Sequence, residues 1–298
     1  MGWIKCLIKN FLFLAQNDLK KYYEELTYEL SDKIIEDIVY EYEEDIKSTK
    51  KLVILDENES IDLVMKAPKS FCRLGDGEID IIDGKDTPFQ KYDRELAEEL
   101  KKILKNDRDD MYVGINRAYY HSPNHFSDRN KKFYRLYSYR FRHIFNSYCD
   151  FNKVYLDAGF LGAYYRYKDD YDYKTHYNKM KNLFKDKKIL LICGKNIDKN
   201  LQNDVFEYAK EKKVIYGPLK DAYAVHKSII DEVNNTIPKD YLVCIILGMT
   251  AKVICSKLTD LGYMAWDIGH LAKDYDVYMQ GLEKTEENID KFWAPDEE

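Results

Sequence analysis

Residues 188–194 read KILLICG and residues 241–248 read YLVCIILG, and these two stretches decide the fold class. Each is a run of mostly isoleucine, leucine and valine that ends in glycine. Continuous apolar runs of this length are typical of strands buried on both faces, as the inner strands of a parallel sheet are. We therefore expect a sheet whose two faces are covered by helices.

Six more short runs along the chain have the same character, and amphipathic stretches separate them. The expected strands are Lys51–Leu55, Ser70–Leu74, Met111–Ile115, Lys153–Asp157, Lys188–Cys193, Lys213–Tyr216, Tyr241–Leu247 and Tyr263–Ile268. The expected helices are Asp93–Lys105, Lys131–Tyr148, Tyr173–Phe184, Leu201–Lys210, Ala222–Asn235 and Ala251–Leu261. Strands that alternate with helices at this spacing indicate βαβ units. The predicted fold class is α/β, with a Rossmann-like, mostly parallel sheet flanked by helices.

The N-terminal part of the chain has a different pattern, because Leu26, Leu30, Ile34 and Ile38 recur at helical spacing among Glu, Lys and Tyr. This predicts an N-terminal helical region over residues 1–50, followed by one domain over residues 51–298. Residues 3–15 are amphipathic but too short to span a bilayer. They are expected to contact a membrane surface, the protein's own domain or a partner subunit, and oligomerisation stays open.

The composition excludes several classes of protein. The 298 residues include 47 Lys and Arg against 53 Asp and Glu, a net charge of −6, which argues against a nucleic-acid partner. The six cysteines form no C-x-x-C pair, so a zinc ribbon has no support. Cys193 and Cys244 lie inside apolar runs, as buried thiols of a reducing cytoplasm do. We expect a cytoplasmic protein, either free or at the inner face of the membrane.

Glycines follow the expected strands unusually often for a chain with only 13 of them. Those at or just after a strand end are Gly75, Gly77, Gly114, Gly159, Gly194, Gly217, Gly248 and Gly269. In open α/β sheets, ligands bind beyond the carboxyl ends of the strands. The glycines therefore favour a ligand site at that edge, although glycine also ends strands for conformational reasons alone.

Residues 71–78, FCRLGDGE, carry the first candidate chemistry. A strand leads into a glycine-flanked loop with Asp76 and Glu78 two residues apart, and two hard oxygen ligands suit Mg²⁺ or Mn²⁺ completed by water and a diphosphate. Arg73 is placed to pair with a phosphate or to hold a carboxylate. A polar surface turn is the competing interpretation.

The other candidates also follow expected strands. They are Asn116 and Arg117, Gly194 and Lys195, Gly217 and Tyr223, Gly248 and Thr250, and Asp267 and His270. A helix that begins near Thr250 would bind an anion, and Lys195 would neutralise a phosphate. Asp221 is expected to cap a helix. The chain has no G-x-G-x-x-G, no P-loop and no G-x-S-x-G, so dehydrogenases, Walker-type nucleotidases and serine hydrolases are disfavoured.

Taken in order, several of these pieces resemble the GT-D family of bacterial glycosyltransferases. They are residues 73–78 (RLGDGE), 89–93 (FQKYD) with Leu96, 217–218 (GP), 222–223 (AY), 247–252 (LGMTAK), 261–263 (LGY) and 267–270 (DIGH). The resemblance implies a Rossmann-like domain that binds a nucleotide sugar and a divalent metal through a D-x-E motif. Asp76 and Glu78 match that motif, while His270 matches only by its strand-end context. Met249 stands where the family often has proline.

On this basis we expect a metal-dependent glycosyltransferase that moves a sugar from a nucleoside diphosphate sugar, a UDP-sugar, to a glycan hydroxyl in polysaccharide or glycoprotein glycan synthesis. Asp76 and Glu78 would hold Mn²⁺ or Mg²⁺, and His270 or Asp267 would assist the metal or act on the acceptor. The expected phosphate contacts are Arg73, Lys195 and the amides near Thr250, and the expected nucleoside or sugar contacts are Asn116, Arg117 and Tyr223. Gly75, Gly194, Gly217 and Gly248 would let backbone approach the donor. Another nucleotide-dependent phosphoryl or nucleotidyl enzyme, and a non-catalytic glycan-binding scaffold, remain as alternatives.

Overall fold

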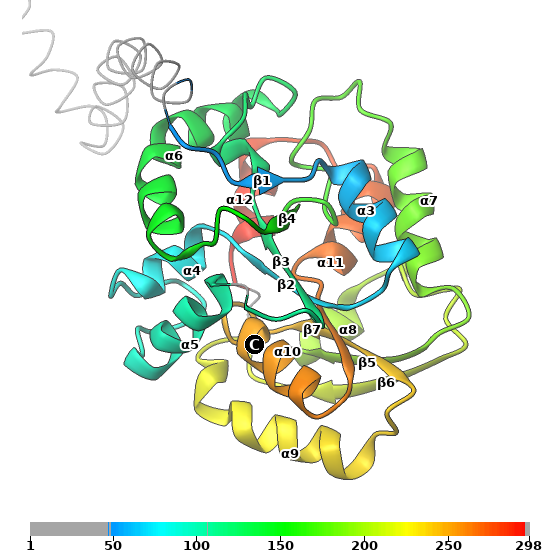
Figure 1. Cartoon of the computed structure of the whole chain (residues 1–298). Helices are drawn as coiled ribbons and strands as arrows, with labels where there is room; N and C mark the ends of the chain where they lie inside the picture. Colours follow the sequence, from blue (N-terminus) through cyan, green and yellow to red (C-terminus); the bar gives the residue numbers. More distant parts are fainter. Residues whose placement is uncertain (1–46, 48, 106, 296–298) are drawn as a thin grey trace, which may run out of the picture.

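The computed structural model describes residues 47, 49–105 and 107–295, and they form one eight-stranded sheet in the order β1-β4-β3-β2-β8-β7-β5-β6 (Figure 1). Every strand pair is parallel. The strands are β1 (Val53–Ile54), β2 (Ser70–Leu74), β3 (Met111–Ile115), β4 (Val154–Asp157), β5 (Lys188–Cys193), β6 (Glu211–Tyr216), β7 (Tyr241–Ile246) and β8 (Met264–Asp267). All eight expected strands are therefore present, and the predicted fold class is confirmed.

Helices connect the strands and cover the sheet (Figure 1). They are α3 (Glu57–Lys66), α4 (Asp76–Ile82), α5 (Arg94–Leu104), α6 (Asp128–Tyr148), α7 (Tyr173–Phe184), α8 (Lys195–Asn200), α9 (His226–Thr236), α10 (Thr250–Asp260), α11 (Leu271–Gln280) and α12 (Glu286–Trp293). Short 3-10 turns occupy Arg117–Tyr119 and Ala222–Val225. Helix α10 packs against β2, β7 and β8 and lies between α5 and α9.

Two of the predictions about helices are wrong. Residues 201–210 form turns instead of a helix, because the carboxylate of Asp276 accepts hydrogen bonds from the main-chain N–H groups of Gln202 and Asn203. Asp221 does not cap the turn that follows it. The main chain at Asp221 has a left-handed conformation, with φ of 52°. Its carboxylate accepts a hydrogen bond of 2.7 Å from the main-chain N–H of Lys91 instead.

The core runs through the middle of the sheet. Phe71 of β2 stacks on Trp266 of β8 with ring centroids 5.1 Å apart, and both side chains are buried. Cys193 and Cys244 are buried and unbonded, as expected for structural thiols. This close packing fixes the relative positions of the strand ends that carry the candidate site.

The predicted helical region over residues 1–50, and with it the amphipathic stretch 3–15, falls almost entirely outside the described residues. No helix within the described ranges is both long and apolar enough to cross a membrane.

Candidate active site

A cavity of about 520 Å³ opens at the carboxyl edge of the sheet. Its wall includes a residue just beyond each of five strands, namely Gly75 after β2, Asn116 after β3, Ala158 after β4, Gly248 after β7 and Gly269 after β8. Its volume is within the range of pockets that bind small molecules. The cavity lies where the placement of the glycines predicted a ligand.

The D-x-E pair lies in the first turn of helix α4 and not in the expected loop. Asp76 is the first residue of that helix, and Glu78 Oε2 accepts a hydrogen bond of 2.8 Å from the Gly75 N–H. Carboxylates are favoured at a helix N-terminus, where main-chain N–H groups are unpaired. This explains why a short acidic sequence after a glycine begins a helix here.

Asp76 extends its carboxylate into the cavity. Removal from bulk water by the cavity walls raises the pKa of Asp76, and repulsion from Glu78 raises it further. Two carboxylates that repel each other in a cavity are a setting in which a cation gains binding energy.

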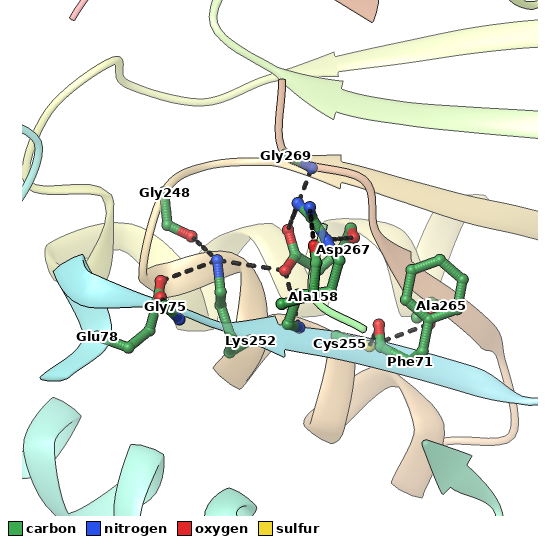
Figure 2. Close-up of polar contacts among 11 residues, drawn as sticks. Phe71, Gly75, Glu78, Ala158, Gly248, Lys252, Cys255, Ala265, Asp267 and Gly269 are labelled. Atoms are coloured by element: carbon green, nitrogen blue, oxygen red, sulfur yellow. Dashed lines mark hydrogen bonds and ion pairs between the residues drawn. The ribbon is translucent and has the colours of Figure 1, made fainter. Parts of the chain in front are cut away.

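Lys252 joins the carboxylates of two distant segments (Figure 2). Its Nζ lies 2.9 Å from Glu78 Oε1 and 3.2 Å from Asp267 Oδ2, and it donates to the Gly248 carbonyl at 3.0 Å. Although burial alone would lower the pKa of Lys252, Asp267 and Glu78 hold it above its ordinary value. Lys252 is therefore a buried cation with its three donors occupied.

Arg73 lines the cavity and binds Asp267, which lies outside the lining. The main-chain N–H of Arg73 donates to Asp267 Oδ2 at 3.1 Å. Its side chain donates from Nε to the Asp267 main-chain carbonyl at 2.9 Å and from Nη1 to the Ala158 carbonyl at 3.0 Å. Although burial would raise the pKa of Asp267, Lys252 and Arg73 hold it below its ordinary range. Of the two roles expected for Arg73, the geometry favours holding a carboxylate.

His270 lines the cavity and immediately precedes helix α11. Its ring centroid is 6.2 Å from that of Phe89, 5.4 Å from Phe292 and 5.2 Å from Trp293. Helix α12 supplies the rings of Phe292 and Trp293. Arg129 of α6 forms hydrogen bonds with Glu286 and Asp290, which also belong to α12. Aromatic rings from three separate segments, those of Phe89, His270 and Trp293, thus line the cavity.

The structure brings half of the candidate residues to the cavity wall. Those that line it are Arg73, Gly75, Asp76, Glu78, Asn116, Gly248 and His270. The candidates outside the lining are Arg117, Gly194, Lys195, Gly217, Tyr223, Thr250 and Asp267.

Three of the residues outside the lining pack against other parts of the chain. A side chain at Gly194 would overlap Leu219, Tyr223 stacks on His226 with ring centroids 4.2 Å apart, and Thr250 Oγ1 donates to Gln90 Oε1 at 3.2 Å. Thr250 is the first residue of α10, and Met249, not Thr250, is its N-cap. These contacts fit structural roles.

Sequence reasoning missed several residues of the wall, namely Lys252, Tyr119, Tyr134, Arg129, Arg166 and Trp293. Lys252 had a signal, because it lies four residues after Gly248 and therefore one helical turn further on. Arg166 and Trp293 follow no strand end, so the rule that selected the other candidates could not find them.

The carboxylates at this site fit a divalent cation whose remaining coordination positions are filled by a substrate. No group of three or more His, Cys, Asp or Glu that could hold a metal occurs among the described residues. Asp76 and Glu78 supply two carboxylates, and each Glu78 oxygen keeps a second lone pair beside its bond to Lys252 or Gly75. Mg²⁺ is commonly bound by one or two carboxylates together with water and substrate phosphates.

The curated relatives of this chain are streptococcal. "Probable glycosyl transferase Gly" of Streptococcus gordonii is 27% identical over 246 residues, which cover 78% of this chain and 34% of that protein. "Glycosyltransferase GlyD" of Streptococcus pneumoniae serotype 4 is 26% identical over 234 residues, which cover 75% of this chain and 27% of that protein. The matched region thus spans about a third of the length of the first relative and about a quarter of the length of the second.

Solved structures share the fold. A structure described as the highly conserved domain of unknown function 1792, with a distinct glycosyltransferase fold, superimposes with a TM-score of 0.76 at 24% identity over 86% of this chain and 95% of that one. A structure described as a new glycosyltransferase from Streptococcus sanguinis gives a TM-score of 0.73 at 25% identity over 83% of this chain and 96% of that one. The model of the family described as the glycosyltransferase GT-D fold matches residues 71–294, which include every strand of the sheet except β1 and the first residue of β2. The chain belongs to the GT-D family of glycosyltransferases.

Proposed function

We propose that this chain transfers a sugar from a nucleoside diphosphate sugar, a UDP-sugar, to a hydroxyl group of a glycan acceptor, and that the reaction requires Mn²⁺ or Mg²⁺. The observation that carries the proposal is the carboxylate pair Asp76 and Glu78 in the wall of a cavity at the carboxyl edge of the sheet. Membership of the GT-D family supports the class of reaction.

The residues of the site have separable tasks in this proposal. As the glycosidic bond of the donor breaks, negative charge grows on the departing diphosphate, and a divalent cation held by Asp76 and Glu78 would neutralise it. Lys252 holds Glu78 in position, and Arg73 with Asp267 supports Lys252 from below.

Two further residues face the substrates. Asn116 donates one amide hydrogen to the Tyr134 hydroxyl at 2.7 Å, which leaves its second amide hydrogen for a sugar or ribose oxygen. His270 also lines the cavity, and in this proposal it takes the proton of the acceptor hydroxyl.

The test measures release of nucleoside diphosphate and formation of glycosylated acceptor over a panel of nucleotide sugars, with and without Mn²⁺. The variant is Asp76→Asn, and the control is Asp62→Asn, an exposed carboxylate in α3. We expect Asp76→Asn to lose about 100-fold or more in rate, since several kcal/mol of charge stabilisation would go with the metal, whereas the control keeps full activity.

Full activity in Asp76→Asn would overturn the metal assignment. Release of pyrophosphate or phosphate in place of nucleoside diphosphate would indicate another nucleotide-dependent enzyme. Binding of glycans without turnover or metal dependence would indicate a scaffold.

We further propose that the acceptor belongs to polysaccharide or glycoprotein glycan synthesis and that the reaction occurs in the cytoplasm, at the inner face of the membrane. The amphipathic pattern of residues 3–15 supports the membrane contact. Deleting residues 3–15 should shift the protein from the membrane fraction to the supernatant, and an unchanged distribution would contradict the membrane contact.

A further inference from the structure

Arg166 lines the cavity, and its charged guanidinium has a buried donor without an acceptor among the described residues. It lies in the segment that follows β4, and its guanidinium Nη1 is buried and has no hydrogen-bond partner. Among the described residues, no ion pair or side-chain hydrogen bond involves this guanidinium. A buried charged donor without an acceptor destabilises a protein, so its presence calls for an explanation.

The nearby carboxylates do not supply the missing acceptor. Asp157 and Asp274 raise the pKa of Arg166 by their charge, against the effect of burial. The Asp157 carboxylate, however, accepts hydrogen bonds from main-chain N–H groups. The Asp274 carboxylate accepts them from a main-chain N–H group and from the Tyr177 hydroxyl. The Arg166 guanidinium therefore stays charged but is not directly bonded.

Three other cations of the wall already have acceptors within the chain. Arg73 donates to Asp267 and Ala158, Lys252 to Glu78 and Asp267, and Arg129 to helix α12. Arg166 differs from these three because its buried Nη1 has no acceptor among the described residues.

The guanidinium is held at a defined place. A methyl group at Gly159 would overlap Nη1 of Arg166, so the absence of a side chain there makes room for it. The charges of Arg166 and Asp76 both act on the phenols of Tyr119 and Tyr134. Arg166, Asp76 and these two tyrosines line the same cavity.

We propose that Arg166 binds an oxyanion of the substrate in this cavity. The inference rests on the proposed function for the kind of substrate, though not for the presence of the anion site. A guanidinium presents paired N–H donors that match phosphate and carboxylate oxygens. Two parts of a glycosyl donor have this chemistry, namely its diphosphate and the carboxylate of an acidic sugar.

The first measurement is calorimetric binding of inorganic pyrophosphate and, separately, of glucuronate, in buffer that contains Mg²⁺. The variants are Arg166→Met, which removes the charge, and Gly159→Ala, which displaces the guanidinium without removing it. Arg94→Met, at an exposed position in α5, is the control for net charge. Both variants should bind the anion about 10- to 100-fold more weakly, because that is the affinity lost with a hydrogen bond between charged groups. The control should bind as the wild type does.

The two probes separate the sources of the anion. Weakened binding of pyrophosphate assigns Arg166 to the donor diphosphate, and weakened binding of glucuronate alone assigns it to a sugar carboxylate. Unchanged binding of both anions in both variants would overturn the proposal. If the wild type binds an anion through Arg166 but turns over no nucleotide sugar, the proposed function is wrong and the anion site stands.

The second measurement is the melting temperature without ligand. Removing an arginine with a purely structural role would lower the melting temperature. Because the charge is unpaired, Arg166→Met should melt at the same temperature as the wild type or higher, and pyrophosphate should no longer raise it. A lower melting temperature combined with unchanged stabilisation by both anions would assign Arg166 a structural role.

Discussion

Lys252 shows how one residue can tie together the parts of a site that come from distant segments. It comes from α10, while its two carboxylate partners come from α4 and from the end of β8. All three side chains are at most 8% exposed. Removing the cation leaves Glu78 buried without its counter-charge and leaves Asp267 paired with Arg73 alone.

We expect Lys252→Met to destabilise the protein by about 3–5 kcal/mol, the usual cost of removing one partner from a buried ion pair. Chemical denaturation measures this. The matched control is Lys257→Met, which removes a half-exposed lysine of the same helix that pairs with Glu99 at 3.3 Å and should cost about 1 kcal/mol or less. Equal losses in the two variants would contradict a central role for Lys252.

His176 is a second residue whose environment has a measurable consequence. The Tyr171 hydroxyl lies 3.1 Å from Nδ1, and Nε2 lies 3.1 Å from the Leu161 carbonyl, an arrangement that fits a neutral ring with its proton on Nε2. Burial lowers the pKa of His176 to about 4. The native protein therefore keeps this ring neutral at pH values at which the unfolded chain protonates it.

Protonation of His176 should weaken the fold as the pH falls from about 6.5 towards 4, because in that window the unfolded state binds the proton and the native state does not. Above that window the ring is neutral in both states and contributes no pH dependence. His176→Gln keeps an amide donor and acceptor but cannot titrate, so its stability should fall less steeply, with a difference of about 3 kcal/mol across the window. Urea titrations at pH 7, 5.5 and 4.5 measure this, and parallel pH profiles for the two proteins would contradict it.

At this scale the sequence predicts only part of the site. Asp76, Glu78 and Asn116 could be found because each follows an apolar strand, and the carboxyl ends of parallel strands share one edge. The burial of Lys252 and the missing partner of Arg166 depend on segments far away in the chain. No local pattern encodes them.

Among the elements, helix α12 is anchored more weakly than the rest of the domain. Ile289 and Phe292 bury themselves with Tyr165 and Val277 in a small cluster that is separate from the main core. The same helix brings Trp293 to the cavity wall. The helix can therefore open locally without unfolding the sheet.

Phe292→Ala should detach helix α12, because replacing a buried phenylalanine costs about 3–5 kcal/mol, more than an eight-residue helix supplies by itself. Hydrogen exchange should rise in residues 286–293 while exchange in β5 and β7 stays slow. Lys291→Ala, on the exposed side of the same helix, serves as the control and should leave exchange unchanged. Equal acceleration throughout the sheet would show that α12 belongs to the global unfolding unit.

Local pattern was sufficient for the strands but not for every helix. The apolar runs 188–193 and 241–246 could hardly be anything but strands, since they are short and apolar at every position from the second to the last. Helix α3 was not expected although Asp56 and Glu59 form a capping box, a signature visible in the sequence. The error at residues 201–210 has a different origin, because Asp276, about 70 residues further on, captures their amides.

For the whole molecule, the five described cysteines report on global unfolding. All are buried, and burial raises their pKa values, to about 12 for Cys149 and Cys193. A neutral buried thiol does not react with alkylating agents. Each should therefore become reactive only when the domain unfolds.

Mass mapping after treatment with iodoacetamide at pH 8 should show these five cysteines unlabelled in native protein and labelled in denaturant. The peptide with Cys6 is read separately, since that residue lies outside the described part of the chain. Rapid native labelling of any of the five would show that its surroundings open without global unfolding.

The position of β8 in the sheet also governs how the protein can be made. Ribosomes deliver β1 to β4 first and β5 to β7 next, yet β8 has to enter between β2 and β7, two strands from the separate halves of the chain. Until residues 264–269 leave the exit tunnel, Arg73 and Lys252 have no Asp267 to bind, and the cavity lacks the wall at Gly269. A nascent chain therefore carries no finished pocket, and this edge of the sheet is completed only when translation has passed β8, the last strand of the described residues.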